Sequence, residues 1–277
     1  MTTLDFQGRI ALVTGGGKGV GRVVASKLAQ RGAHVIVNYF HSQDEAQRTE
    51  SEIRSRGGSV EILRGSVAKP DAVDAMFDEI ARRHDGLDVL VNNAAYSAMR
   101  PFRELTERDW DRVVGTGLHG VRWCTLAAAP LLAQRRGCIV NMSSVGATMA
   151  VPNYVAAGVT KAAVEALTRY LAVEFAPDGI RVNTASASSV DGAVVSAWPH
   201  SDVLRPLMEQ AAPLGHVLVS PDEYAEAVLF LASAASTGIT GQVLIVDRGT
   251  TTGYAAAASY WKYARTEGRN DPMPERL

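Results

Sequence analysis

Tyr154 and Lys161 are the two residues whose types and spacing best suit acid–base chemistry. A tyrosine hydroxyl has an ordinary pKa of about 10, too high for ready proton exchange at neutral pH. A nearby ammonium group stabilises the phenolate and so lowers that pKa. The two residues are seven positions apart, almost two helical turns, so they would share one face of a helix. An incidental pair on an amphipathic helix is the alternative.

A glycine-rich loop at 14–21 is a candidate binding site for a dinucleotide. It reads T-G-G-G-K-G-V-G and lies between an apolar run and a helical pattern. Glycine allows positive φ and close approach to a pyrophosphate, while a helix N-terminus supplies amide donors and a positive dipole end. A purely structural turn is the alternative, but the strand–loop–helix context favours a dinucleotide. The loop residues expected to contact the cofactor are Gly15, Lys18, Gly19, Val20, Gly21 and Arg22.

The end of the second expected strand bears on the choice between NAD and NADP. A site selective for NAD usually places a carboxylate there, on the ribose hydroxyls. Residues 37–42 contain no carboxylate, and Asn38, Tyr39 and Ser42 would not repel a 2′-phosphate. Lys18 and Arg22 add positive charge nearby, although each alone is more often a solvated surface residue. The sequence therefore predicts NADP(H) as the cofactor.

Short β-branched runs alternate with longer helical patterns, which predicts βαβ units and a parallel sheet. The expected strands lie at 10–14, 34–38, 60–63, 89–92, 138–142, 181–184 and 243–246. The expected helices lie at 19–31, 43–56, 72–84, 108–134, 154–175 and 221–232. Right-handed crossovers then give an α/β fold, a single Rossmann-type doubly wound parallel sheet of about seven strands flanked by helices. Residues 1–253 would form one NADP(H)-binding catalytic domain, with 254–277 as a C-terminal extension.

Composition and charge exclude several classes of protein. Hydrophobic residues make up 47% of the 277-residue chain, so a large core can form. The net charge of −1 gives no electrostatic basis for binding nucleic acid or an anionic membrane. Cys124 and Cys138 match no metal-ligand spacing, so buried free thiols and no metal site are expected. The sequence shows no export signal and no apolar run of about 18 residues, which predicts a soluble cytoplasmic protein.

The glycine loop and three later motifs resemble the short-chain dehydrogenase/reductase family. The loop matches the family pattern T-G-x-x-x-G-x-G, and it is followed by N-N-A-A at 92–95, N-M-S-S at 141–144 and the Tyr–Lys pair. The resemblance covers residues from about 6 to 250. It implies contacts with the adenine, the nicotinamide ribose and the floor of the cofactor site. The residues that it adds to cofactor binding are Ser66, Val67, Asn93, Ala94 and Lys161.

The seven-residue interval from Tyr154 to Lys161 resembles enoyl-acyl-carrier-protein reductases, because ketone and alcohol reductases of the family usually show Tyr-x-x-x-Lys. The resemblance implies NADPH-dependent hydride delivery to the β-carbon of a 2-enoyl thioester linked to acyl carrier protein or CoA, in fatty-acid or secondary-metabolite biosynthesis. Tyr154 would stabilise the oxygen of the enolate. Ser144 would supply a second catalytic hydroxyl, with Ser143 as its competitor and a strand-end cap as the alternative role.

Departures from the family pattern keep two other functions open. The main alternative is a carbonyl reductase that acts on 3-oxoacyl thioesters or ring ketones. Many ketoreductases of the family carry Asn where this chain has Gly117, which weakens the case for this alternative. The usual Pro-Gly and Thr after the sixth strand are replaced by Ala187-Ser188 and Gly192, which leaves the backbone of Val190 to meet the cofactor carboxamide. Because of these changes, the third hypothesis is a protein that binds the cofactor but has no catalytic activity.

The stretch at 186–215 is too long for an ordinary connection and is expected to be a substrate lid. Trp198 would cover an acyl chain or ring, together with Ala95 and Tyr96 on the loop after the fourth strand; packing onto the domain is the equal alternative. Family members commonly associate through two long helices, here 108–134 and 154–175, which implies a homodimer or homotetramer. The expected partner is a small-molecule or carrier-linked acyl substrate. Binding to nucleic acid or to a membrane is not expected.

Overall fold

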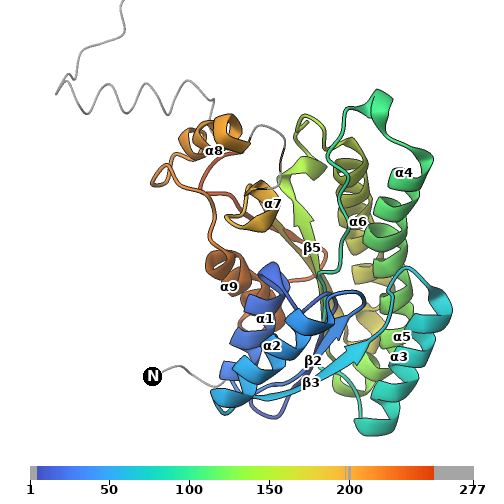
Figure 1. The fold of residues 1–277 in the computed structure, drawn as a ribbon. Helices are drawn as coiled ribbons and strands as arrows, with labels where there is room; N and C mark the ends of the chain where they lie inside the picture. Colours follow the sequence, from blue (N-terminus) through green and yellow to red (C-terminus); the bar gives the residue numbers. More distant parts are fainter. Residues whose placement is uncertain (1–4, 197, 199–200, 253–277) are drawn as a thin grey trace, which may run out of the picture.

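The computed structural model describes residues 5–196, 198 and 201–252 of the chain. One sheet of seven parallel strands runs through the molecule in the order β3-β2-β1-β4-β5-β6-β7 (Figure 1). The predicted Rossmann-type fold is therefore confirmed. The strands are β1 Ile10–Val13, β2 His34–Tyr39, β3 Ser59–Arg64, β4 Val89–Asn92, β5 Cys138–Ser144, β6 Arg181–Ala187 and β7 Val243–Val246.

Helices cover both faces of the sheet, and local signals set where several of them begin. Ser220 and Glu223 form a capping box ahead of α9, and Pro221 suits its first turn because that position needs no amide donor. The α-helices are α1 Gly19–Gln30, α2 Gln43–Ser55, α3 Pro70–Arg83, α4 Glu107–Val114, α5 Gly120–Arg135, α6 Val155–Glu174, α7 Ala193–Ser196, α8 Ser201–Gln210 and α9 Pro221–Ala232. The short helices are η1 Phe102–Glu104, η2 Gly115–His119, η3 Val145–Ala147, η4 Ala176–Asp178 and η5 Ala234–Ser236.

The core has two layers, one on each face of the sheet. Helices α1, α2 and α9 bury their apolar residues against one face, and α3, α5 and α6 bury theirs against the other. Successive side chains of a strand point to opposite faces, so Val35 and Val37 join the first layer and Ile36 the second. Of the helices in the described part of the chain, none has the length and apolar character needed to cross a membrane.

Two expectations about the elements need correction. The helix expected at 108–134 is divided into α4 and α5 by η2, a π-helical turn at Gly115–His119. The stretch at 186–215 contains α7 and α8, two helices that were not expected, and its role as a substrate lid stays a prediction. The C-terminal extension at 254–277 lies outside the described residues.

A chain of buried polar side chains crosses the middle of the sheet. The Asn92 amide in β4 donates to Asn141 in β5, and Asn141 donates to Thr168 in α6, both at 2.9 Å. The hydroxyl of Thr168 lies 2.8 Å from that of Thr184 in β6. Because buried polar groups need partners, these residues fix three neighbouring strands and a helix in one arrangement. The carboxyl ends of those strands therefore have defined positions, and the candidate site lies there.

Candidate active site

The glycine loop joins β1 to α1, and two asparagine side chains hold its backbone. Asn38 near the end of β2 accepts a hydrogen bond from the amide of Gly15 at 3.3 Å and donates to the carbonyl of Gly65 at 3.0 Å. Asn93, after β4, donates to the carbonyls of Thr14 and Gly15 at 2.8 and 3.0 Å. The loop is therefore tied to the strands on both sides of β1.

The loop has the form of a cradle for a phosphate group. A Cβ on Gly21 would lie 2.5 Å from Nδ2 of Asn93, so only glycine fits there. Gly19 has φ +55° and open space where its side chain would be. Lys18 caps α1 without a side-chain hydrogen bond, and the first turn contains no acidic residue. The first-turn amides and the helix dipole thus suit a pyrophosphate, and the residues present fit a dinucleotide.

The other predicted cofactor residues lie around this loop in different environments. Asn38 is buried with its side chain committed to backbone groups, and Val67 is buried against Gly120. Arg22 is exposed and lies 3.7 Å from Glu52 of α2. Tyr39 is the last residue of β2, Ser42 follows β2 and Ser66 follows β3, and all three are half-buried. Lys18, which precedes α1, is exposed. Their contacts with a cofactor stay a prediction.

A cavity with a volume of about 410 Å³ opens next to the loop, at the carboxyl ends of β5 and β6. Residues of the stretch at 186–215 line it on one side and the start of α6 on another. Many of the predicted site residues meet at this cavity. Those that line it are Val20, Asn93, Ala95, Ser144, Tyr154, Lys161, Val190 and Trp198.

Tyr154 lies immediately before α6, with its ring over Gly146. Burial raises the pKa of Tyr154, and a hydrogen bond with Ser144 partly opposes that rise. The ring centroid of Tyr154 is 6.4 Å from that of Trp198, whose Nε1 is buried without a hydrogen-bond partner among the described residues. The phenol is therefore protonated at neutral pH and lies among groups that can donate hydrogen bonds.

Lys161 lies on α6, seven residues after Tyr154, and its Nζ donates a hydrogen bond to the carbonyl of Met142 at 2.6 Å. Burial lowers the pKa of Lys161 to about 8, although the nearby Glu165 opposes this effect. Glu165 is itself buried and accepts a hydrogen bond from Ser143 at 2.6 Å. From the sequence, the ammonium group was expected to lower the pKa of Tyr154. This expectation is corrected, because burial raises that pKa and the group that opposes the rise is Ser144, not Lys161.

Two tyrosines differ from the sequence expectations. Tyr96 is not among the residues that line the cavity, and its ring packs under the guanidinium of Arg112 at 4.1 Å. Tyr224 of α9 was not expected at the site, yet it lines the cavity. Its hydroxyl lies 2.9 Å from the carbonyls of Ser143 and Ala185, so it joins the ends of β5 and β6. No local pattern indicates this role, because α9 is distant in sequence from both strands.

Comparison with known proteins identifies the family. A family model described as "Enoyl-(Acyl carrier protein) reductase" matches residues 15–251. The 3-oxoacyl-[acyl-carrier-protein] reductase FabG of Staphylococcus aureus is 39% identical over 243 residues, which are 86% of this chain and 96% of the relative. The chain belongs to the short-chain dehydrogenase/reductase family. As a member of this family, it is an oxidoreductase.

Solved structures of short-chain dehydrogenases/reductases share the whole fold. A gluconate 5-dehydrogenase from Burkholderia cenocepacia J2315, in complex with NADP and tartrate, has a TM-score of 0.84 and 31% identity, covering 91% of this chain and 99% of its own. A short-chain type dehydrogenase/reductase from Mycobacterium marinum has a TM-score of 0.84 and 32% identity, covering 91% and 98%.

The expectation that enoyl reduction is the leading reaction is wrong. The relatives at 38–39% identity, from two Staphylococcus species, are reductases of a 3-oxoacyl group. A 1-cyclohexenylcarbonyl-CoA reductase from Streptomyces collinus, whose name gives a conjugated thioester, is 35% identical over 87% of this chain and 86% of the relative, a lower identity than that of the 3-oxoacyl reductases. The seven-residue interval did not identify the reaction, because carbonyl reduction and enoyl reduction both need a hydroxyl donor at a substrate oxygen. The described site supplies Tyr154 and Ser144 for either reaction, so the interval alone does not separate them.

Proposed function

We propose that this short-chain dehydrogenase/reductase uses NADPH to reduce a carbonyl group, in a 3-oxoacyl thioester or a ring ketone, to an alcohol. The observation that carries the proposal is the protonated hydroxyl of Tyr154, which is hydrogen-bonded with Ser144 and lines the cavity. The 3-oxoacyl reductases at 38–39% identity support the same class of reaction.

Tyr154 and Ser144 have complementary roles in this reaction. A carbonyl oxygen that accepts hydrogen bonds from both hydroxyls is polarised, and negative charge gathers on it as the carbon is reduced. Tyr154 then gives its proton to the alkoxide, so the C=O group gains one hydride and one proton and becomes an alcohol. A reduced nicotinamide, when bound, supplies the hydride. The raised pKa of Tyr154 keeps the proton available until the alkoxide forms.

NADPH is the proposed form of the nicotinamide cofactor. Residues 37–42, at the end of β2 and directly after it, carry no carboxylate to repel a 2′-phosphate, and Lys18 and Arg22 place two positive charges beside the loop. The related gluconate 5-dehydrogenase was solved with NADP. A fluorescence titration is expected to give tighter binding of NADPH than of NADH, and the reverse order would remove Lys18 and Arg22 from cofactor selection.

The substrate is proposed to enter beneath α7 and α8. Trp198 and Met208 line the cavity on that side, and apolar residues at 149–151 line another. Nε1 of Trp198, which makes no hydrogen bond with the residues that the structure describes, is a further donor for an oxygen of the substrate. An acyl chain or ring suits the apolar walls, while the polar groups at Tyr154 and Ser144 orient its carbonyl.

A substrate comparison tests the proposed reaction. With NADPH present, acetoacetyl-CoA is expected to cause loss of cofactor absorbance faster than crotonyl-CoA, which carries a conjugated double bond and no ketone. Tyr154→Phe is expected to keep the NADPH dissociation constant while kcat falls by about 10²–10⁴-fold, because the proton donor is lost. Consumption with crotonyl-CoA alone, or full turnover by Tyr154→Phe, would contradict the proposal.

We also propose that the protein forms a homodimer or homotetramer through α5 and α6. Apolar residues are exposed along α6 at helical spacing, including Val159, Tyr170 and Val173, and Leu126 is exposed on the neighbouring α5. Large apolar side chains at regular spacing on one helix face commonly mark a contact surface.

A further inference from the structure

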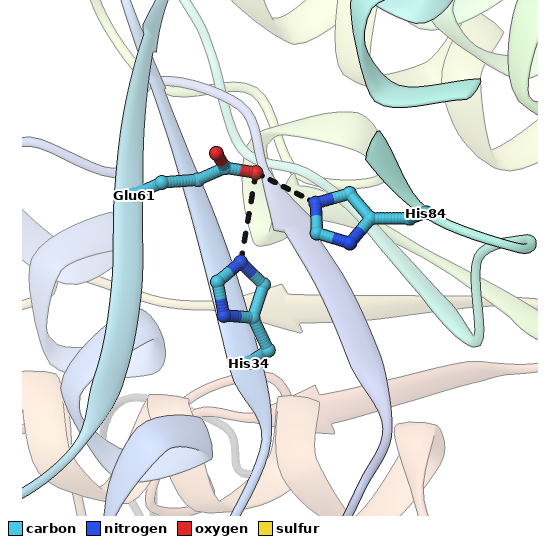
Figure 2. A group of neighbouring side chains, drawn as sticks. All are labelled: His34, Glu61 and His84. Carbon is cyan, nitrogen blue, oxygen red and sulfur yellow. Dashed lines mark hydrogen bonds and ion pairs between the residues drawn. The ribbon is translucent and has the colours of Figure 1, made fainter. Parts of the chain in front are cut away.

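Three side chains with metal-binding atoms meet at the amino edge of the sheet, away from the cavity. His34 is the first residue of β2, Glu61 lies within β3, and His84 directly follows α3. Figure 2 shows both imidazole rings turned toward the carboxylate of Glu61. One ligand atom from each residue lies within 4.8 Å of the other two. The cluster therefore has the size of a metal-binding site.

Regular elements bring these residues together. Strands β2 and β3 pair in parallel with Ile36 opposite Glu61. His34 and Ile36 point to the same face of the sheet, and α3 packs on that face through residues including Ile80. His84 at the end of α3 thus reaches Glu61 from above the sheet. A site built on strands and a helix keeps its geometry better than one built on loops.

The contacts within the cluster leave one nitrogen, Nε2 of His34, with only a long contact to Glu61. Oε1 of Glu61 lies 2.8 Å from Nε2 of His84 and 3.5 Å from Nε2 of His34. Nδ1 of His34 lies 2.7 Å from Oγ of Ser59, a hydrogen bond that orients the ring. Nε2 of His34 is buried and makes no hydrogen bond with any described residue. An imidazole nitrogen and a carboxylate oxygen that face each other in this way are stabilised when a cation binds to both atoms.

We propose that His34, Glu61 and His84 bind one divalent transition-metal ion, with zinc as the best match. Zinc prefers imidazole nitrogen and carboxylate oxygen ligands at about 2.0–2.2 Å, so two ligands of a tetrahedral ion lie about 3.3 Å apart. The His34–Glu61 distance of 3.5 Å already matches that spacing. The His84–Glu61 distance of 2.8 Å has to widen by about half an ångström, which a side-chain rotation supplies. Water fills the fourth position.

Neighbouring residues support the three ligands. Arg83 lies 2.7 Å from Oε2 of Glu61, so the other oxygen, Oε1, is the one directed to the metal. Arg83 also pairs with Glu79, which balances its positive charge. Outer hydrogen bonds of this kind, together with the one that Nδ1 of His34 donates to Oγ of Ser59 when Nε2 binds the metal, orient metal ligands. Two imidazoles disfavour magnesium, which prefers about six oxygen ligands.

The position of the site indicates a structural role. The ion would link β2, the edge strand β3 and the end of α3, while the cavity lies at the carboxyl ends of β5 and β6. Metal that binds the folded chain raises its stability. No metal site was expected from the sequence, because His34 and His84 are fifty positions apart with Glu61 between them and no ligand spacing is recognisable.

Calorimetric titration of the full-length protein, freed of metal with EDTA and dialysed, tests the proposal. Zinc chloride is expected to bind with one ion per chain, and magnesium chloride is expected to give no binding. His34→Gln and His84→Gln are each expected to weaken zinc binding by more than about 100-fold, beyond the loss typical of an outer partner. His216→Gln removes an exposed histidine of the segment before α9 and is the matched control, with zinc binding as in the wild type.

Thermal unfolding supplies a second readout that does not depend on catalysis. Zinc at about 100 times its dissociation constant is expected to raise Tm by about 5 °C in the wild type and His216→Gln, but not in the other two variants. If His34→Gln and His84→Gln both leave zinc binding unchanged, the proposed site is wrong. The cluster would then be an ion pair between Glu61 and the two histidines. Reductase activity is expected to persist in EDTA, and its loss there would overturn the structural role.

Discussion

Gly146 lies directly beneath the ring of Tyr154, and this contact links a backbone position to the proposed proton donor. A Cβ at position 146 would approach Cε1 of Tyr154 to 2.6 Å and Cδ1 to 2.7 Å. The ring has to move by nearly an ångström to relieve that contact. Displacement of a reacting group by about 1 Å can cost about 10²-fold in rate.

Gly146→Ala is therefore expected to lower kcat/KM by about 10²-fold while NADPH binding is unchanged. Steady-state kinetics and a fluorescence titration with NADPH separate the two effects. Gly115→Ala is the control, because a Cβ there meets nothing within 4 Å. Equal activity of the two variants would show that the ring position over Gly146 has no part in turnover.

Lys161 should impose an upper pH limit on reduction. Burial lowers its pKa to about 8, so its ammonium form prevails below that pH and is lost above it. The positive charge favours both the anionic cofactor and the negative charge that develops on the carbonyl oxygen. We expect kcat/KM to fall about tenfold per pH unit above about pH 8. The pKa of Tyr154 is raised, so the tyrosine stays protonated across this range; a profile that stays flat two pH units above the lysine pKa would contradict this assignment.

Among the elements, the π-helical turn η2 is where the chain departs most from a regular helix, and Gly117 lies at its centre. A Cβ on Gly117 would approach Cγ2 of Thr160 to 2.8 Å, and a β-branched side chain has little freedom to turn away. Thr160 is buried, and the next residue is Lys161. The absence of asparagine at position 117 thus follows from close packing of η2 on α6.

Gly117→Ala is expected to destabilise the protein by about 1–2 kcal/mol, because overpacking outweighs the helical preference of alanine. In a Thr160→Ser background the clashing methyl group is gone, so the same substitution is expected to stabilise by up to about 1 kcal/mol. Urea unfolding of the four proteins measures both values. The same sign in both backgrounds would contradict the packing argument.

The sequence predicted most strands to within one or two residues, because strands buried on both faces are apolar throughout. The ends of β5 and β6 extend further than expected, to Ser144 and Ala187, since these polar and small residues pair in register. Helix α8 contains Pro206, which interrupts the pattern by which a helix is found. Residue types and spacing led to Tyr154 and Lys161, and the family resemblance added Ser144 and Asn93. Tyr224 depends on contacts between segments distant in sequence.

At the scale of the whole molecule, the outer face of α6 bears on the oligomeric state. Val173 is 75% exposed and Tyr170 72%, high values for large apolar side chains on a long helix that packs against the sheet. A contact surface formed with a second copy would bury them.

Val173→Glu is therefore expected to shift the protein to a smaller species in light scattering after gel filtration, because the contact would bury an unpaired carboxylate. Val203→Glu is the matched control, since Val203 is 58% exposed on α8 and lies away from this face. Unchanged mass for Val173→Glu would place the contact elsewhere.

The chain of side chains from Asn92 through Asn141 and Thr168 to Thr184 also bears on how the sheet assembles. A strand that pairs one residue out of register turns every side chain to the opposite face. Such a slip would leave the buried amides without partners, at about 1–3 kcal/mol for each group. Apolar strands attract one another in any register and do not discriminate in this way. These four residues thus favour the native register of β4, β5 and β6 over misaligned pairings.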